Sequence, residues 1–131
     1  MTAVKVLIVD DEKEFASTLV ERLNIRGFDA SAVYSGEDAL PFIQSKDIPD
    51  VVLLDLKMPV MGGMKTLAAI KEFDPDIEVI LFTGHDTSRI EIDDQKGKTF
   101  EFLMKPSHIN EITEKIDKAV AKRLASSKQE Q

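Results

Sequence analysis

The sequence predicts an α/β protein with a doubly wound parallel sheet of five strands and helices on both faces. Three apolar runs, KVLIV, VVLLD and EVILF, are rich in β-branched residues or leucine and lack alternation, as strands buried on both faces do. Helical patterns separate successive strands. Alternation of strands and helices implies right-handed crossovers within one parallel sheet.

Five strands follow from the apolar runs. The three runs quoted above give strands at 5–9, 51–55 and 78–82, and the weaker runs DASAV and TFEFLM add 29–33 and 99–104. In a sheet of this kind, ligands bind at the carboxyl ends of the strands, near the point where the strand order reverses. The residues that follow each strand are therefore the candidates for function.

Helices are predicted where apolar residues recur at helical spacing, and these stripes are expected to face the core. The first helix, 14–26, is ended by Gly27, a residue typical of helix C-termini. Segment 86–98 has only Ile90 and Ile92 as apolar residues and predicts a short or mobile fourth helix. The stripes are Phe15, Leu19, Val20 and Leu23 on 14–26; Ala39, Leu40 and Ile43 on 36–44; Met64, Leu67, Ala68 and Ile70 on 63–73; and Ile109, Ile112, Ile116, Ala119 and Val120 on 109–124.

Length and composition set the class of protein. The chain has 131 residues, which suits one domain, expected at 1–124, and the final stretch 125–131 has little to bury and predicts a disordered tail. The net charge of −7 disfavours direct binding of nucleic acid. No apolar run is long enough to cross a bilayer and the N-terminus does not read as a secretory signal, so a cytoplasmic protein without membrane contact is expected.

Reactive side chains follow four of the five predicted strands. Asp10 and Asp11 come after the first strand, Asp55 closes the third, Thr83 follows the fourth, and Lys105 follows the fifth. Taken singly, each has an ordinary structural explanation, such as capping a helix or lying in solvent. Their convergence on one edge of the sheet favours a functional site.

The residue types at this edge indicate magnesium-dependent phosphoryl chemistry. Cysteine is absent, which leaves oxygen ligands, and Mg²⁺ accepts one or two carboxylates together with phosphate oxygens. Asp55 is held by a buried strand, as a nucleophile requires. A phosphoryl group on Asp55 could be met by Mg²⁺, the Lys105 ammonium and the Thr83 hydroxyl on different sides.

Four motifs carry a resemblance to a known family: IVDDE, VVLLDLKMPVMGG, ILFTG and FLMKP, in the family's order and with similar spacing. Over about residues 3–124 the chain resembles the receiver domain of two-component response regulators. The resemblance implies a flavodoxin-like (βα)5 fold. It also implies that phosphate comes from a sensor histidine kinase or a phosphotransfer protein.

The resemblance assigns roles to individual residues. Asp55 would be the phosphoryl acceptor, and Asp10, Asp11, Asp55 and the Lys57 carbonyl would bind Mg²⁺. Thr83 and Lys105 would contact the phosphoryl group, the Lys105–Pro106 bond would be cis, and Phe102 would be the aromatic whose rotamer follows Thr83. One departure is Gly62, which stands where the family very often has aspartate; it implies a weaker cap for the third helix at a difference of a few tenths of a kcal/mol.

These observations predict a stand-alone receiver that acts on an unknown protein target and is no enzyme beyond its own phosphorylation and slow dephosphorylation. One alternative is a phosphohydrolase of the haloacid dehalogenase type. That chemistry needs a second acid two residues after the nucleophile, where this chain has Lys57. The other alternative is an interaction module that keeps the fold without the phosphoryl chemistry, against which the intact site residues argue.

Overall fold

The computed structural model describes residues 3–45, 48–56, 58, 62–83, 101–105 and 108–129. Within these ranges it contains one five-stranded parallel sheet in the order β2-β1-β3-β4-β5. This confirms the predicted doubly wound α/β fold, while the helix expected within 86–98 lies outside the described residues. The strands are β1 (Lys5–Val9), β2 (Asp29–Val33), β3 (Val51–Asp55), β4 (Glu78–Thr83) and β5 (Glu101–Met104), and the helices are α1 (Lys13–Ile25), α2 (Gly36–Gln44), α3 (Gly62–Phe73) and α5 (Ile109–Gln129).

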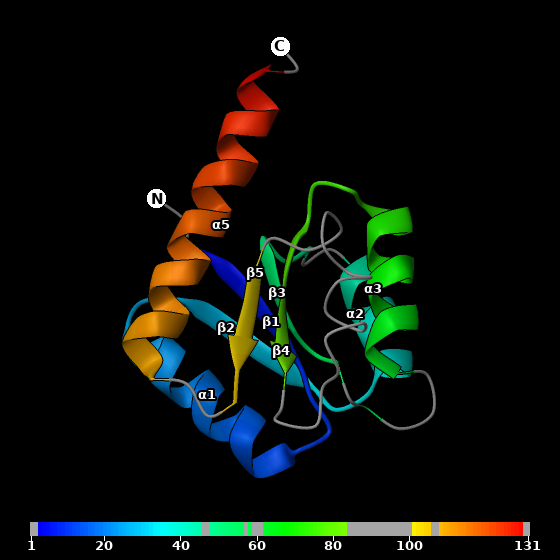
Figure 1. The fold of residues 1–131 in the computed structure, drawn as a ribbon, viewed down its shortest axis with the longest axis vertical. Coiled ribbons are helices and arrows are strands. Elements are labelled where there is room, and N and C mark those ends of the chain that lie inside the picture. The colour runs from blue at the N-terminus through cyan, green and yellow to red at the C-terminus, as the bar shows by residue number, and fades with distance from the viewer. Residues whose placement is uncertain are drawn as a thin grey trace.

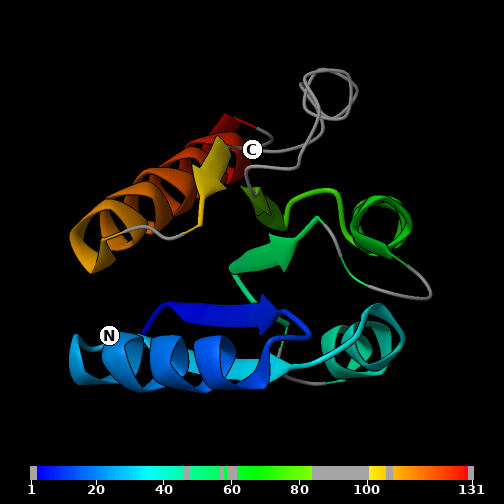
Figure 2. The same ribbon diagram turned by 60° about the horizontal axis from the view of Figure 1, so that its bottom comes forward.

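The helices lie in two layers, one on each side of the sheet (Figures 1 and 2). Helices α1 and α5 cover one face, and α2 and α3 cover the other. The strand order reverses at β1, because β2 pairs with one side of β1 and β3 with the other. The carboxyl ends of β1 and β3 therefore meet at the switch point where such sheets place their ligands.

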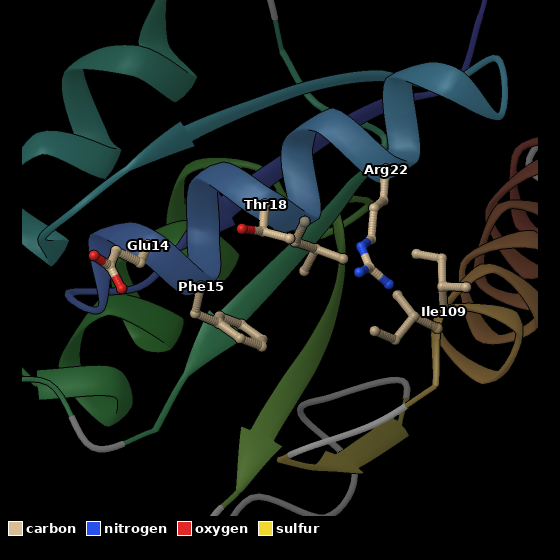
Figure 3. Close-up of a pocket in the computed structure, with 7 residues that line it drawn as sticks. Glu14, Phe15, Thr18, Arg22 and Ile109 are labelled. Carbon is tan, nitrogen blue, oxygen red and sulfur yellow. The ribbon is translucent and has the colours of Figure 1, made fainter.

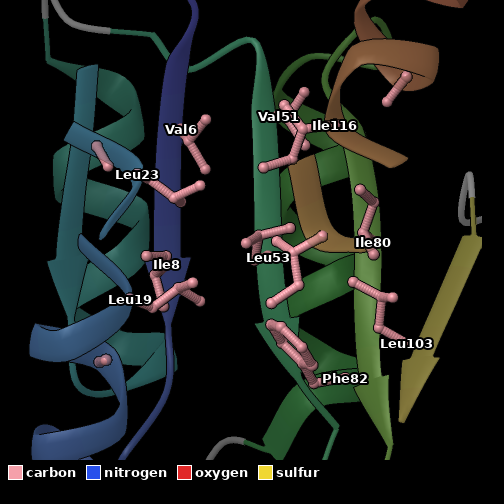
Figure 4. Close-up of a cluster of buried hydrophobic side chains, with 14 residues drawn as sticks. Val6, Ile8, Leu19, Leu23, Val51, Leu53, Ile80, Phe82, Leu103 and Ile116 are labelled. Carbon is pink, nitrogen blue, oxygen red and sulfur yellow. The ribbon is translucent and has the colours of Figure 1, made fainter. Parts of the chain in front are cut away.

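Each face of the sheet has its own hydrophobic core. Val6 and Ile8 of β1 pack toward α1 and α5, whereas Leu7 and Val9 pack toward α2 and α3. This explains why the strand sequences show no polar alternation. Figure 4 shows the first core, in which side chains of β1, β3, β4 and β5 meet those of α1 and α5. Full burial of each large side chain stabilises the fold by about 1.5–3 kcal/mol.

Helix α1 begins and ends one residue earlier than predicted. Gly27 has a φ of +92°, a conformation that glycine adopts without steric cost, and its N–H donates to the Asn24 carbonyl. Phe28 N–H reaches back to the Leu23 carbonyl, which completes the helix C-terminus. The role predicted for Gly27 is confirmed.

The predicted core stripe of α3 is partly wrong. Met64 and Ala68 are exposed, while Gly63 and Thr66 are buried together with Leu67 and Ile70. The inward face therefore starts one residue earlier than hydrophobicity suggested. Thr66 can be buried because its hydroxyl donates to the Gly62 carbonyl at 2.7 Å.

Helix α5 continues to Gln129, whereas residues 125–131 were expected to be disordered and the helix to end at 124. The extension contains neither glycine nor proline, so nothing local stops the helix. Its C-terminal end projects past the sheet in Figure 1. Earlier in the helix, Arg123 Nε lies 3.6 Å from Asp50 Oδ1 and Lys122 Nζ lies 3.8 Å from Glu78 Oε2, contacts that fasten α5 to the amino edge of the sheet. A domain boundary at 124 stays a prediction.

None of the helices in the described part of the chain is both long and apolar enough to span a membrane.

Candidate functional site

Three carboxylates meet at the carboxyl edge of the sheet. Asp10 follows β1 and is completely buried, Asp55 ends β3 with 6% of its surface exposed, and Asp11 is exposed. One carboxylate oxygen from each lies within 4.8 Å of the others. Val9 pairs with Leu54 in the sheet, so the register sets Asp10 and Asp55 side by side. The predicted convergence of these acids is present in the structure.

Lys105 brings a positive charge to the same edge. Its Nζ lies 2.6 Å from Asp10 Oδ2 and 3.5 Å from Asp55 Oδ2. It also donates a hydrogen bond of 3.0 Å to Glu12 Oε1. The convergence of Lys105 with the acids is as predicted, but no role was predicted for Glu12. The available signal was its place as the third acid of VDDE.

Asp10 also organises the start of α1. Its Oδ1 accepts a hydrogen bond of 2.9 Å from the backbone N–H of Glu12, the residue just before the helix. A short turn of this kind lets an aspartate satisfy backbone groups that the helix leaves unpaired. Asp10 Oδ1 thus binds the loop backbone, and Oδ2 contacts Lys105.

Burial and charge act in opposite directions on this cluster. Burial raises the pKa of Asp10, and its contacts with Lys105 and the Glu12 N–H only partly offset that rise. For Lys105, burial alone would lower the pKa, but contacts with Asp10 and Glu12 and the nearby charge of Asp55 raise it. Lys105 therefore stays charged, whereas burial makes the ionised form of Asp10 less favourable.

The donor set suits a hard divalent cation. Three carboxylates supply oxygen ligands of the type that Mg²⁺ prefers. A divalent cation would also relieve the cost of ionising buried Asp10. The fourth predicted contributor, the Lys57 carbonyl, lies outside the described residues, so its role stays a prediction.

Replacing Asp10 by asparagine is expected to stabilise the metal-free protein at pH 7 by up to about 1 kcal/mol. Burial raises the pKa of Asp10, so between its ordinary pKa of 3.8 and the raised pKa the folded state binds more protons than the unfolded state does. The free energy of unfolding therefore falls as pH rises through this window, and the loss remains at pH values above it. Asparagine removes this loss. It also weakens cation binding, so Mg²⁺ should stabilise the parent more than the variant.

Urea unfolding with chelator and with Mg²⁺ measures both effects. Asp117→Asn, which changes an exposed acid on α5, is the control and should behave as the parent does. If Asp10→Asn were less stable than the parent in chelator, the ion pair with Lys105 would outweigh the effect of burial.

The remaining predicted residues are only partly described. Thr83 ends β4 and pairs in register with Met104, the residue before Lys105, so its backbone lies at the same edge. The Thr83 side chain and Pro106 lie outside the described residues. Phe102 is half-buried and packs against the core under α2 and α3, and its coupling to Thr83 stays a prediction.

Two adjacent glycines build the start of α3 for different reasons. Gly62 has a φ of +77°, and a Cβ there would meet nothing within 4 Å. At Gly63 a Cβ would lie 2.6 Å from the Asp55 carbonyl oxygen and 2.6 Å from Leu56 Cα. Gly63 N–H donates to the Leu56 carbonyl at 3.2 Å. The second glycine thus lets α3 approach the backbone of the acidic strand end, which the sequence analysis did not predict.

The backbone conformation of Gly62 explains why glycine stands here instead of the aspartate that the family very often has. A left-handed φ is costly for residues with a side chain and free for glycine. Glycine therefore suits this backbone better than a conventional capping residue would.

The parallel five-stranded sheet, with acids and a lysine clustered at the carboxyl ends of its strands, defines a domain of the doubly wound α/β class, in which ligands bind at that edge. The sequence profile of the response regulator receiver domain matches residues 6–117. The chain belongs to this family, whose members are signalling switches.

Known proteins agree with this assignment. The transcriptional regulatory protein ZraR of Salmonella typhimurium is 30% identical over 118 residues, which are 90% of this chain and 26% of ZraR. A receiver domain protein from Clostridium thermocellum has a TM-score of 0.86 at 30% identity, covering 93% of this chain and 98% of that one. A CheY-like receiver from Methanospirillum hungatei shares the fold, with a TM-score of 0.88 at 21% identity over 95% of this chain and 99% of that one.

The chain spans about a quarter of the length of the curated relatives it matches. Its similarity to them concerns the receiver part of longer regulators.

Proposed function

We propose that the protein is a phosphorylatable switch that accepts a phosphoryl group on Asp55 in a Mg²⁺-dependent reaction. The observation that carries the proposal is the surroundings of Asp55. Its carboxylate is nearly buried at a strand end, within 4.8 Å of carboxylate oxygens of Asp10 and Asp11 and 3.5 Å from the Lys105 ammonium. A fixed carboxylate beside a cation pocket and a lysine is equipped to become an acyl phosphate.

The transfer step forms one bond and breaks another. An Asp55 oxygen bonds to phosphorus as the bond from phosphorus to the donor breaks, and the electron pair leaves with the donor group. When the donor is a phosphohistidine, the departing imidazole nitrogen takes a proton from solvent. Lys105, now held by Asp10 and Glu12, is close enough to Asp55 to move onto a phosphoryl oxygen.

Asp10, Asp11, Asp55 and the Lys57 carbonyl would hold Mg²⁺, which supplies positive charge to the phosphoryl oxygens. The protein residues do the rest. Asp10 keeps the loop in place through Glu12 N–H, β3 keeps Asp55 at the edge, and Thr83 would contact the phosphoryl group from β4.

Membership of the receiver family supports the partners that we propose. The donor would be a phosphohistidine on a sensor histidine kinase or phosphotransfer protein. The phosphoryl charge would bias Thr83, Phe102 and the surface around β5 and α5, and so select a downstream protein target. The stand-alone state and the cytoplasmic location expected from the sequence stay predictions.

Neither alternative function has a supporting observation. A phosphohydrolase of the haloacid dehalogenase type would need an acid at Lys57. An interaction module without phosphoryl chemistry would not require Asp10 to be buried beside Asp55 and Lys105, where burial disfavours its ionised form. Slow release of the phosphoryl group to water is the only turnover we propose.

The test is intact mass after incubation with acetyl phosphate. With Mg²⁺ we expect one phosphoryl adduct, and with chelator none. Hydroxylamine should convert the acyl phosphate to a hydroxamate in the peptide that contains Asp55. No adduct under conditions that label a well-behaved receiver, or an adduct in another peptide, would overturn the proposal.

A further inference from the structure

The ring of Phe15 lies beneath the Lys105 ammonium, beside the acidic site. Lys105 Nζ lies 4.6 Å from the centroid of the Phe15 ring. An ammonium at this distance over an aromatic face is attracted by the ring's negative face. Only 16% of the Lys105 side chain is exposed, so the ammonium is partly shielded from water. Its anionic partners and this ring together fix where it lies.

The Phe15 ring is itself held in place. It packs edge-to-face on Phe82, with centroids 5.5 Å apart and planes at 89°. Phe82 is 1% exposed, pairs in register with Asp55, and accepts a hydrogen bond of 3.1 Å from Leu56 N–H through its carbonyl. Phe82, which pairs with Asp55 in the sheet, therefore packs against the Phe15 ring that contacts the Lys105 ammonium.

Phe15 also lines a cavity of about 330 Å³ between α1 and α5, with Glu14, Thr18, Leu19, Arg22, Ile109 and Ile112. Figure 3 shows Phe15 extending from α1 on the side where Ile109 lies. The cavity leaves room for a larger aromatic side chain at this position. An aliphatic residue at this position would leave the ammonium without an aromatic face.

We infer that Phe15 is a positioning residue for phosphoryl transfer, holding the Lys105 ammonium over its ring and within reach of Asp55. The inference rests on the proposed function, because it gives Phe15 its effect through the lysine that would meet the phosphoryl group. During phosphoryl transfer the Lys105 ammonium must leave the carboxylates of Asp10 and Glu12 and contact phosphoryl oxygens instead. The ring contact does not compete with the phosphoryl oxygens, so it can persist while the anionic partners change.

Phosphorylation rates test the inference. With acetyl phosphate and saturating Mg²⁺, Phe15→Leu should be phosphorylated about three- to tenfold more slowly than the parent, on the scale of a cation–π contact. Phe15→Tyr keeps an aromatic face and should restore most of the rate. Phe28→Leu, a half-buried phenylalanine that packs on the same core, should stay near the parent.

A double-mutant cycle separates positioning from packing. In a Lys105→Met background, Phe15→Leu should have no further effect on the rate, because the group that the ring positions is gone. If Phe15→Leu does not fold, Phe15→Met takes its place in the cycle. A parental rate for Phe15→Leu, a loss that persists without Lys105, or a Tyr variant as slow as the Leu variant would each overturn the inference.

A measurement on phosphate-free protein tells failure of the inference from failure of the proposed function. The protein is labelled with ¹³C-lysine, and the NMR signal of the Lys105 ε-protons is assigned by its loss in Lys105→Arg. The Phe15 ring should shift this signal upfield. In Phe15→Leu the chemical shift should return to the ordinary value for lysine. An ordinary shift in the parent would overturn the placement of Lys105 whatever the phosphorylation result. An upfield shift without any phosphorylation would support the placement and refute the proposed acceptor role.

Discussion

Asp55→Asn is expected to lose the phosphoryl adduct entirely, a fall in the phosphorylation rate of at least about 10²-fold. Asparagine has nearly the same shape as aspartate, but its amide oxygen is a poor nucleophile. The variant also brings one fewer carboxylate to the cation pocket and so should bind Mg²⁺ less tightly. Intact mass after exposure to acetyl phosphate and Mg²⁺ measures the loss directly.

The substitution should leave the fold intact, which makes the result interpretable. Asp55 is 6% exposed and lies among two other acids, so removing its charge relieves repulsion while its place beside Lys105 is kept. We expect a free energy of unfolding within about 1 kcal/mol of the parent. Asp117→Asn, on the exposed face of α5, is the matched control and should be labelled normally. Labelling of Asp55→Asn at the parental rate would show that another residue accepts the phosphoryl group.

The sheet and the meeting of distant residues were predictable because they depend on strand ends. In a parallel sheet, whatever follows each strand comes to the same edge, so Asp10, Asp55 and Lys105 could be placed together from sequence order. The boundaries of β1, β2 and β3 were predicted correctly from their apolar runs, whereas β4 ends one residue later and β5 begins two residues later than predicted. These inferences require no knowledge of how any helix is tilted or shifted.

Features that depend on the exact seating of helices were not predictable. Phe15 was recognised only as part of a core stripe, although α1 also brings its ring under Lys105. Met64 was assigned to the core because it is apolar, whereas close approach of α3 at Gly63 rotates it outward. Hydrophobic periodicity identifies a helix face to within about one residue and cannot resolve such a shift.

Gly63→Ala is expected to have the largest effect on stability, lowering the free energy of unfolding by about 3 kcal/mol. The new methyl group would lie 2.6 Å from both the Asp55 carbonyl oxygen and Leu56 Cα, and 2.8 Å from the Leu56 carbonyl oxygen. All three are backbone atoms, so no side chain can rotate away. The helix or the end of β3 must move, and phosphorylation of Asp55 should slow together with the loss of stability.

Gly62→Ala separates this close approach from ordinary backbone strain. Its methyl group would meet nothing within 4 Å, but its φ of +77° is unfavourable for alanine, so we expect a loss of about 1 kcal/mol. The strain lies one residue away from the contact with Asp55 and Leu56, and the phosphorylation rate should stay near that of the parent. Urea unfolding and the rate of labelling by acetyl phosphate measure the two effects on both variants.

The comparison decides why two glycines stand at this turn. If Gly63→Ala were as stable as Gly62→Ala and labelled at the parental rate, the backbone of Asp55 would not depend on the approach of α3. If Gly63→Ala alone slows labelling, the seating of α3 helps to set the position of the acceptor. The Asp55 carboxylate would then be placed from two sides, by Gly63 through the main chain of β3 and by the sheet pairing with Phe82.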